Sequence, residues 1–382
     1  MDIRTVNDIL NKITAKMERV HRRIGVAAPY TTGSDGKYDD ITDAYPEGWT
    51  NGFYPGMLWL LYAQTGQDSY REYAQKIEEK LEKMFLKASS LHHDMGFIWL
   101  NSAVKDYDLT GNAQSRERAL LAAYVLASRY NIKGRFIRAW NGEMQTGTGI
   151  IDCMMNIPLL YWASEQEHDP RFAYIADSFA HTVMNSHIRA DGSVNHIVSY
   201  DIETGEVIKA YGGQGYADGS SWSRGQAWAI HGFAQCYGKT GNDEYLQISK
   251  RVANYFIASI GSNYIPRCDF RQPAEPDIID TTAGTVAASA FISLAEYTPE
   301  NERQMYLDAA CNILSAYDKN ICNWSEDSEE LVPYGTEAYH KESGIHIPII
   351  YGDYYFIGAV CKLKQYYETG KAGDGLGEFR RR

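Results

Sequence analysis

Apolar and charged residues recur with the period of a helix along much of the chain. Residues 68–85 place Tyr70, Tyr73, Ile77 and Leu81 on one side, with charged residues opposite. This spacing predicts an amphipathic helix that lies on a core and faces solvent. The same pattern predicts amphipathic helices over 116–130, 171–184, 244–259 and 304–318.

A second set of segments is apolar on most sides. Helices of this composition are buried on most of their surface. They alternate along the chain with the amphipathic segments, so an inner helix is followed by an outer one. The apolar segments are 52–66, 152–166, 224–241, 282–297 and 352–370.

Polar turns join an apolar segment to the amphipathic one that follows. They lie at Gly66, Gly111, Asp169, Gly241 and Pro299, with steps of 45, 58, 72 and 58 residues. This is an irregular repeat of about six helix hairpins, and we expect the last one, at the C-terminus, to be incomplete. The fold predicted is an all-α (α/α)6 barrel in a single domain over residues 1–382; an open solenoid is the alternative.

The long connections precede the inner helices and should meet at one end of the barrel, where they would form a functional site. One of them, residues 191–208, alternates in polarity around a turn at Glu203–Gly205. That pattern predicts a small β-hairpin within the long connection.

Composition narrows the class of protein. Lys and Arg number 37 and Asp and Glu 49, so the net charge is −12 and a nucleic-acid partner is not expected. No apolar run is long enough for a bilayer, and the N-terminus lacks the apolar core of a secretory signal. The six cysteines form no CxxC pair, and we expect free buried thiols and a cytoplasmic location.

The glycine-rich segment from Gly212 to Trp228 has the composition of a ligand-binding loop. Glycine lets a ligand approach the backbone, tryptophan offers a flat face, and Arg224 offers a fork for a carboxylate or sulfate. Because the whole chain is acidic, an anionic ligand must be held by such local groups. The segment indicates a carbohydrate ligand, with acidic carbohydrate first.

Two aspartates are candidate catalytic residues. Asp152 begins a strongly apolar segment, and partial burial disfavours the charged form of a carboxyl, which suits a general acid; a helix N-cap is the alternative role. Asp94 lies between two histidines and a glycine, where a turn or cap is again the alternative. Adjacent histidines in an extended segment point apart, so we expect no metal there.

Several further residues are candidates for substrate contact. Arg224 would lie at the barrel mouth, although a salt bridge to an acid is the commoner fate of an arginine. Tryptophans can stack on sugar rings, with a place in the core as their alternative role. The candidates are Trp49, Trp140, His196, Gln214, Arg224 and Trp228.

These motifs together resemble one enzyme family. HHDMGF around Asp94, IIDCMMNIPLL around Asp152 and the QGYADGSSWSRGQAW segment are similar to the unsaturated glucuronyl hydrolases, glycoside hydrolase family 88. WTNGFYPGMLWLLY and IYGDYYFIGAVCKL extend the resemblance from Trp49 to Leu363. Unsaturated rhamnogalacturonyl hydrolases share the barrel but are not expected to carry the HHDMGF-type aspartate.

The resemblance implies a bacterial enzyme that needs no metal or cofactor. Its substrates would be lyase-generated, glycosaminoglycan-type oligosaccharides that end in a 4,5-unsaturated uronic acid. Asp152 matches the proton donor and base, and Asp94 the second carboxylate. The pocket-lining positions matched are Trp49, Trp140, His196, Gln214, Arg224, Trp228 and, less securely, Tyr339.

Three readings of the chemistry stay open at this point. The first is hydration of the C4=C5 vinyl ether, which releases the unsaturated sugar. The second is an ordinary inverting glycosidase that uses Asp94 and Asp152 as acid and base. The third is a sugar-binding barrel without activity, in which two partly buried carboxyls would be a needless desolvation cost. We expect a monomer or a weak homodimer.

Overall fold

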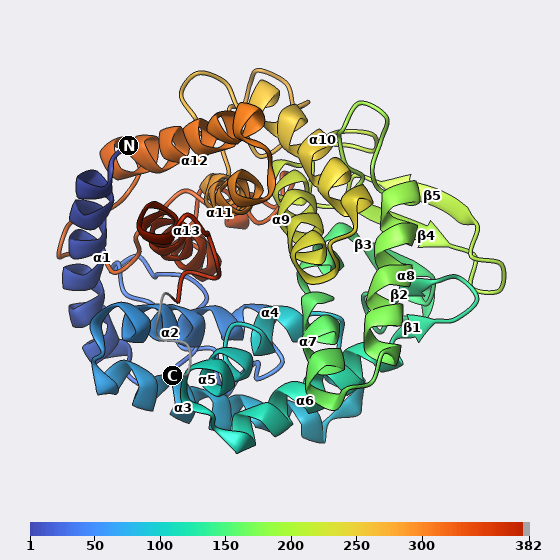
Figure 1. Ribbon diagram of the computed structural model, residues 1–382, viewed down its shortest axis with the longest axis horizontal. Helices are drawn as coiled ribbons and strands as arrows, with labels where there is room; N and C mark the ends of the chain where they lie inside the picture. The colour runs from blue at the N-terminus through green and yellow to red at the C-terminus, as the bar shows by residue number, and fades with distance from the viewer. Residues whose placement is uncertain (377–382) are drawn as a thin grey trace.

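The helices form two concentric rings (Figure 1), and the computed structural model describes residues 1–376. The inner ring consists of α2 (Phe53–Thr65), α4 (Met95–Trp99) with α5 (Ala103–Thr110), α7 (Pro158–Glu167), α9 (Ser223–Thr240), α11 (Thr281–Tyr297) and α13 (Ile350–Thr369). The outer ring consists of α1 (Ile3–Ile24), α3 (Asp68–Leu81), α6 (Ala113–Ser128), α8 (Arg171–Ser186), α10 (Asp243–Ser259) and α12 (Glu300–Asn320). The predicted helical barrel is confirmed.

Burial separates the two rings as the hydrophobic pattern predicts. Every residue of α11 from Thr281 to Ala295 is buried, whereas α3 buries only the stripe through Tyr70, Ile77 and Leu81 together with Ala74 and Glu78. An inner helix contacts neighbours on all sides, while an outer helix keeps one face in water.

The ring is closed by the N-terminal helix. The last hairpin is incomplete, as expected, because no outer helix follows α13 among the described residues; α1 packs against α13 and supplies its outer partner instead. The face of α1 that is buried carries Val6, Ile9, Ile13 and Met17, and the Asp2 side chain caps its first turn by accepting a hydrogen bond from the Thr5 amide. The two ends of the sequence are therefore joined in one barrel.

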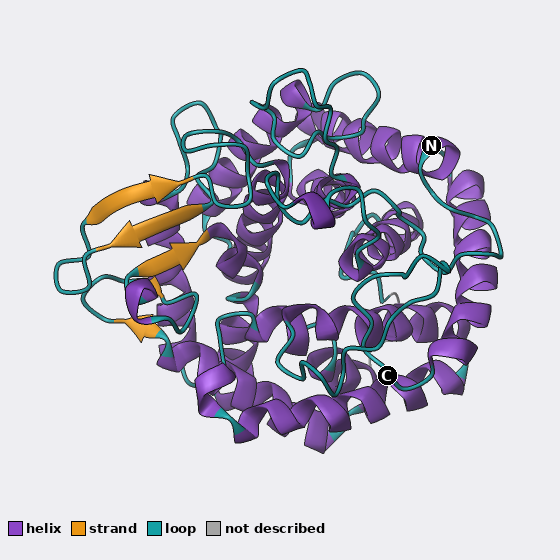
Figure 2. Cartoon of the chain, turned by 180° about the vertical axis from the view of Figure 1, so that it is seen from behind, coloured by secondary structure: helices purple, strands orange, loops and turns teal. Residues whose placement is uncertain are grey.

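The two ends of the barrel differ in the length of their connections. At one end, two-residue turns join α2 to α3, α5 to α6 and α9 to α10. At the other, the long segments 187–222, 260–280 and 321–349 lead into the inner helices (Figure 2). This long-loop end also carries the short helices η1 (Trp49–Gly52) and η5 (Ile151–Met155).

The predicted β-hairpin is confirmed and has a third strand. β4 (Ile197–Tyr200) pairs antiparallel with β5 (Val207–Tyr211), and β3 (Thr148–Ile150) adds to the free side of β4. A second small pair joins β1 (Tyr130–Asn131) to β2 (Phe136–Ile137). The remaining short helices are η2 (Glu82–Leu86), η3 (Ala88–Ser90), η4 (Glu143–Gln145) and η6 (Glu342–Gly344).

All six cysteines are free, and all except the half-buried Cys322 are buried, as predicted for thiols. Among the described helices, none combines the length and apolar character that crossing a membrane requires.

Candidate active site

Asp152 and His196 are brought together by the pairing of β3 with β4. Ile150 lies opposite Ile197 in this pair, and the next backbone bond runs from the Ile151 amide to the His196 carbonyl (3.0 Å). Asp152 follows in η5, with its Oδ2 atom 3.3 Å from Nε2 of His196. Both atoms are buried, and neither has a hydrogen-bond partner among the described residues.

The ring of His196 is held in one tautomer. The backbone amide of Gln214 lies 3.0 Å from Nδ1 of His196, and because an amide N–H can only donate, Nδ1 must accept. The proton of the neutral ring is then on Nε2, the atom that faces Asp152.

Gly213 makes this approach possible. Its φ is +60°, and a Cβ atom there would lie 2.1 Å from Nδ1 of His196. Glycine is thus required both by the backbone conformation and by the close contact.

Asp94 lies between two imidazoles at the start of α4. Its Oδ2 is 3.1 Å from Nδ1 of His92, and its Oδ1 is 3.3 Å from Nε2 of His93. Nδ1 of His92 also lies 3.1 Å from the Asp94 amide. When the His92 ring is neutral, Nδ1 accepts a hydrogen bond from this amide. When the ring is protonated, Nδ1 donates to the Asp94 carboxylate. Nε2 of His92 donates to the Glu47 carbonyl at 2.6 Å.

The three side chains differ in charge because of their surroundings. Burial acts to raise the pKa of Asp94, but its interactions with His93, His92 and Asn156 outweigh burial and lower that pKa. Burial lowers the pKa of His93 below its usual value. Burial also opposes the charge on His92, yet its bond to Asp94 raises its pKa overall. Asp94 is thus an anion near neutral pH, and His92 is its main cationic partner.

Asn156 links the two aspartates. Its Nδ2 atom lies 3.3 Å from Oδ1 of Asp94 and 3.3 Å from the backbone carbonyl of Asp152, while its Oδ1 accepts from the Phe97 amide (2.8 Å). The side chains of Asp152 and Asp94 are 12% and 13% exposed. Both carboxyls therefore lie in one region at the long-loop end, and both reach solvent.

Arg224 supports this region from within the protein. It is 1% exposed, pairs with Asp280, and donates to the carbonyls of Thr336 (2.7 Å) and Glu337 (2.8 Å). Trp222 lies between Arg224, whose Cζ is 4.5 Å from the ring centre, and His196, whose ring is 4.3 Å away. Arg224 thus takes the salt-bridge role that the sequence left as its alternative.

The candidate tryptophans occupy different depths. Trp49 and Trp140 are half-buried. Trp49 contacts Phe97 and Tyr351, and Trp140 follows Ala139, whose carbonyl accepts from the His93 amide at 3.3 Å. Trp228 is fully buried against Phe97, so it packs beneath the site.

Gln214 and Tyr339 join two long connections over the site. Nε2 of Gln214 donates to the Glu337 carbonyl (2.6 Å), and its backbone carbonyl accepts from the Tyr339 amide (2.9 Å). The buried Tyr339 ring meets Tyr216 edge to face at 5.0 Å. These contacts fix segment 336–340 beside the glycine-rich segment.

The sequence did not single out Asn156. A polar amide within the apolar run MMNIP, directly before a helix, was the available signal, because such a group must find buried partners. Gly213 carried no comparable signal, since several glycines surround it.

Comparison with known proteins agrees with this geometry. Residues 26–238 match Glycosyl Hydrolase Family 88. An unsaturated glucuronyl hydrolase of Bacillus sp. (strain GL1) is 34% identical over 367 residues, which cover 92% of this chain and 96% of that protein. An unsaturated chondroitin disaccharide hydrolase of Streptococcus pneumoniae is 31% identical over 328 residues, or 82% of this chain and 81% of that protein.

Solved structures extend the similarity to the whole barrel. The unsaturated glucuronyl hydrolase of Bacillus sp. GL1 superposes with a TM-score of 0.88 at 31% identity, covering 99% of this chain and 100% of that one. An unsaturated glucuronyl hydrolase specific for heparin gives 0.87 at 26% identity, with 97% and 99% covered. The resemblance drawn from the motifs is confirmed: this chain belongs to Glycosyl Hydrolase Family 88 and is a glycoside hydrolase.

Proposed function

We propose that the protein releases the 4,5-unsaturated uronic acid from the non-reducing end of lyase-generated, glycosaminoglycan-type oligosaccharides. Two observations on relatives support the substrate class. The Bacillus sp. GL1 structure is of an enzyme responsible for the degradation of glycosaminoglycan, and another solved structure holds dGlcA-GalNAc6S. The observation that carries the proposal for this chain is the joining of Asp152, His196 and Asp94 in one solvent-reaching region.

The reaction begins at the double bond. The unsaturated sugar is a vinyl ether, and Asp152 donates its proton to C4, which leaves an oxocarbenium-like centre at C5. The Asp152 carboxylate then takes a proton from a water molecule that adds to C5. The hemiketal opens to a C5 ketone, which leaves C1 as a hemiacetal. The hemiacetal collapses to an aldehyde as the bond from C1 to the next sugar breaks, and the departing oxygen takes the proton of the C1 hydroxyl. Proton transfer of this kind contributes on the order of 10²–10⁴-fold to the rate.

The neighbours of Asp152 have separable roles in this scheme. His196 directs an N–H toward Oδ2 of Asp152, which stabilises the carboxylate left after proton donation. The ionised Asp94 accepts hydrogen bonds from sugar hydroxyls. Trp49 and Trp140 contact the sugar faces, while Arg224, Trp228, Gln214 and Tyr339 shape the walls.

An assay with lyase-generated unsaturated disaccharides tests the proposal. Hydration removes the ultraviolet band of the conjugated double bond, whereas an ordinary inverting glycosidase releases sugar and leaves the band intact. The rates with heparin-derived and with chondroitin-derived disaccharides report the preferred substrate. The same assay with EDTA present tests whether the reaction needs a metal. Asp152→Asn is expected to abolish turnover, with Asp169→Asn in a distant turn as the control. Near-normal rates in Asp152→Asn would refute the assignment of the acid.

We also propose a cytoplasmic enzyme that works as a monomer or a weak homodimer. Its six free cysteines suit a reducing compartment. Size-exclusion chromatography at several concentrations tests the oligomeric state. A stable oligomer larger than a dimer would contradict this proposal.

A further inference from the structure

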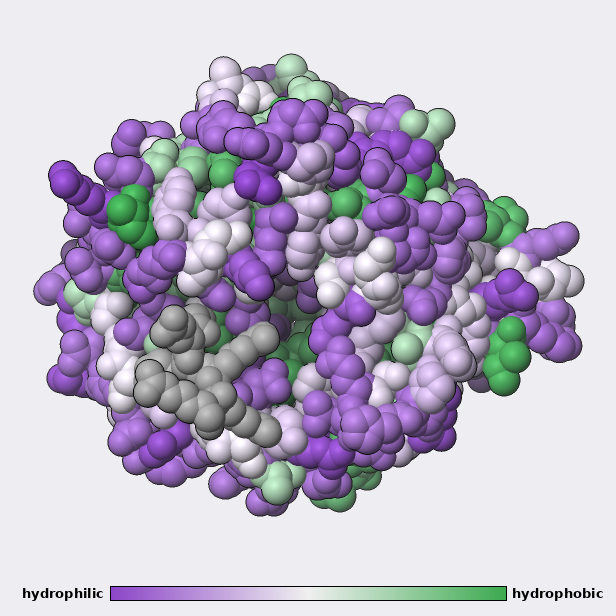
Figure 3. All heavy atoms as spheres, in the orientation of Figure 1, coloured by the Kyte–Doolittle hydropathy of each residue, from purple (hydrophilic) through white to green (hydrophobic). Residues whose placement is uncertain are grey.

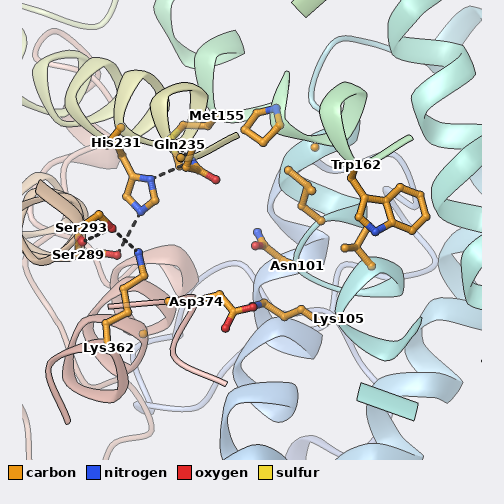
Figure 4. A pocket seen from close by; sticks show the side chains of 18 of the residues that line it. Asn101, Lys105, Met155, Trp162, His231, Gln235, Ser289, Ser293, Lys362 and Asp374 are labelled. Atoms are coloured by element: carbon orange, nitrogen blue, oxygen red, sulfur yellow. Dashed lines mark hydrogen bonds between the residues drawn. The ribbon is translucent and has the colours of Figure 1, made fainter. Parts of the chain in front are cut away.

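A cavity of about 470 Å³ lies inside the barrel, next to the elements that carry the two candidate aspartates. Figure 3 shows a hollow at the centre of the face seen in Figure 1, so the barrel interior is open on this side. Gly96 and Phe97 of α4 line the cavity, and so does Met155 of η5 (Figure 4). Asp94 directly precedes α4, and Asp152 lies within η5. Because a cavity offers no packing contacts to its lining, the positions of both aspartates depend more on contacts made on their other sides.

Arg129, at the C-terminal end of α6, makes such contacts with two separate segments. Its Nη1 donates to the Leu91 carbonyl (2.9 Å), shortly before Asp94. Its Nε and Nη2 donate to the carbonyls of Arg138 (2.8 Å) and Ala139 (3.2 Å). A guanidinium has five N–H groups in fixed directions and can hold several acceptors at once. Arg129 therefore ties the segment before Asp94 to the segment that follows β2.

The segment that follows β2 is linked in turn to both candidate aspartates. The Ala139 carbonyl also accepts from the His93 amide (3.3 Å), next to Asp94. The Ala139 amide donates to the carbonyl of Thr148 (2.9 Å), the first residue of β3, and β3 leads into η5 with Asp152. A displacement of Ala139 would therefore reach the segments of both aspartates.

Asn141 makes a second tie between the same two segments. Its Nδ2 donates to the carbonyls of Ser89 (3.0 Å) and Leu91 (2.7 Å), and its Oδ1 accepts from Nη1 of Arg129 (2.9 Å). Asn141 is exposed, whereas Arg129 is half-buried. Trp140, a candidate for sugar contact, directly precedes Asn141, so both ties act on its position as well.

The Arg129 guanidinium is a cation at neutral pH. Burial, followed by the charge of Arg138, lowers its pKa to about 10, while the charge of Asp94 acts in the opposite direction. All four of the acceptors that Arg129 holds are neutral oxygens. Arg129 thus contributes a positive charge that interacts with Asp94 and a fixed set of hydrogen bonds. A lysine would keep the charge and lose most of the hydrogen bonds.

We propose that Arg129 is a positioning residue of the hydrolase site. Its hydrogen bonds fix the segments of Asp94, Asp152 and Trp140 relative to one another, so that the two carboxyls and the indole face the same sugar. This inference rests on the proposed function, because it gives Arg129 a place in that reaction.

Arg129→Gln tests this role in the ultraviolet assay with unsaturated disaccharides. We expect kcat/KM to fall by on the order of 10²-fold, because a shift of about 1 Å in catalytic groups costs this much. Arg303→Gln is the matched control. Arg303 is also half-buried and donates to the backbone carbonyls of Ala295 (3.1 Å) and Thr298 (3.4 Å), but it lies at the turn between α11 and α12. Its variant should keep kcat/KM within about 2-fold of the parent.

Arg129→Lys separates the hydrogen bonds from the charge. The lysine nitrogen keeps the positive charge, but a single nitrogen cannot hold the carbonyls of both segments. We expect kcat/KM to stay more than about 10-fold below that of the parent. A lysine variant with the parent's kcat/KM would overturn the proposal, because the charge alone would then be sufficient.

Asn141→Ala keeps the proposal testable if the arginine variants do not fold, which circular dichroism and the melting temperature report. Because Asn141 is exposed, its variant should fold, and we expect kcat/KM to fall by about 5-fold or more. Asn185→Ala is its control, since Asn185 is also exposed and donates to a backbone carbonyl, that of His181 (2.8 Å) on α8. If the arginine variants unfold, equal kcat/KM in the two asparagine variants overturns the proposal.

Hydrogen exchange without substrate gives a readout besides activity. The amides of segments 91–94 and 138–141 should exchange faster in Arg129→Gln than in the parent and at the parent's rate in Arg303→Gln. Unchanged exchange of these amides in Arg129→Gln would overturn the proposal. A parent that leaves the ultraviolet band intact would refute the proposed function, and the role of Arg129 with it. An active parent with equal kcat/KM in Arg129→Gln and Arg303→Gln would refute the role of Arg129 alone.

Discussion

At the scale of single residues, Asn156 stands out as a positioning residue for the two candidate catalytic aspartates. Its amide nitrogen contacts the Asp94 carboxylate and the Asp152 backbone, and its oxygen receives the Phe97 amide. Replacing it would leave a buried N–H without an acceptor and let both aspartates shift. Misplacement of catalytic groups by about 1 Å costs on the order of 10²-fold in rate.

Asn156→Ala is therefore expected to lower kcat by on the order of 10²-fold, with a smaller change in KM. Asn101→Ala is the matched control, because Asn101 is also a buried amide, bonded to the Phe97 carbonyl (2.8 Å) and the Tyr354 hydroxyl (2.8 Å) but not to either aspartate. Both variants should lose about 1–3 kcal/mol of stability. Equal kcat values in the two variants would show that Asn156 is only structural.

Replacing Gly213 tests whether activity depends on the position of the His196 ring. Gly213→Ala adds strain at φ +60° and places Cβ against Nδ1 of His196, so the ring must move away from Asp152. Gly219→Ala is the control, because Gly219 has φ +75° but no atom within 4 Å of its Cβ. Each should cost about 1 kcal/mol through the backbone. Steady-state kinetics should show that turnover falls by at least about 10-fold in Gly213→Ala and not in Gly219→Ala. Equal turnover in the two variants would contradict the role given to the position of His196.

At the scale of elements, the strand that sequence reasoning missed is the one that builds the site. The hairpin of β4 and β5 was predictable, because residues 191–208 alternate in polarity around a turn. β3 is three buried residues, Thr148–Ile150, without alternation or flanking signals. Such a short strand is defined only by its partner, so no local pattern placed Asp152 beside His196.

Glu78 is a buried acid where α3 meets α5 and α6, and it makes stability depend on pH. Burial, with the charge of Asp106 second, raises the pKa of Glu78 to about 8. The folded state thus holds a proton between about pH 4.5 and 8 that the unfolded state releases. The stabilisation is complete below the unfolded pKa and is lost as the pH rises through about 8, by on the order of 5 kcal/mol.

Glu78→Gln removes this titration, since a neutral amide can still accept from Trp59 Nε1. The melting temperature of the variant relative to the parent should therefore rise between pH 5 and pH 9. Glu82→Gln, in η2 immediately after α3 and with its side chain 43% exposed, is the control. A constant difference between Glu78→Gln and the parent across this range would rule out Glu78 as the source.

At the scale of the whole molecule, the barrel followed from the alternation of apolar and amphipathic segments, because each kind of helix has a different set of neighbours. The motifs around Asp94 and Asp152 indicated the family but not the depth of each side chain. Arg224 and Trp228 were candidates for substrate contact, and both are buried. Depth depends on segments far apart in the chain, here 336–340 against 212–228, which no local pattern contains.

Closure of the ring also joins distant segments, and α1 is the element that completes it. α1 carries no candidate site residue, yet it packs on α13, and Nζ of its Lys16 donates to the Asn323 carbonyl (2.6 Å) at the start of a long connection. α13 in turn carries Asp353, whose carboxylate accepts from the amides of Leu331 and Val332. Weaker packing of α1 on α13 should therefore also destabilise the long connections at the long-loop end, because α13 holds one of them.

Ile13→Ala, at a fully buried position of α1, is expected to cost about 2–5 kcal/mol. Leu86→Ala is the control, because Leu86 is 88% exposed and should cost little. Because the helices share one ring, heating Ile13→Ala should lower the midpoints of helix melting, tryptophan fluorescence and residual activity together. An early melting of α1 that leaves activity intact would show instead that the N-terminal helix is a separable addition to a barrel closed without it.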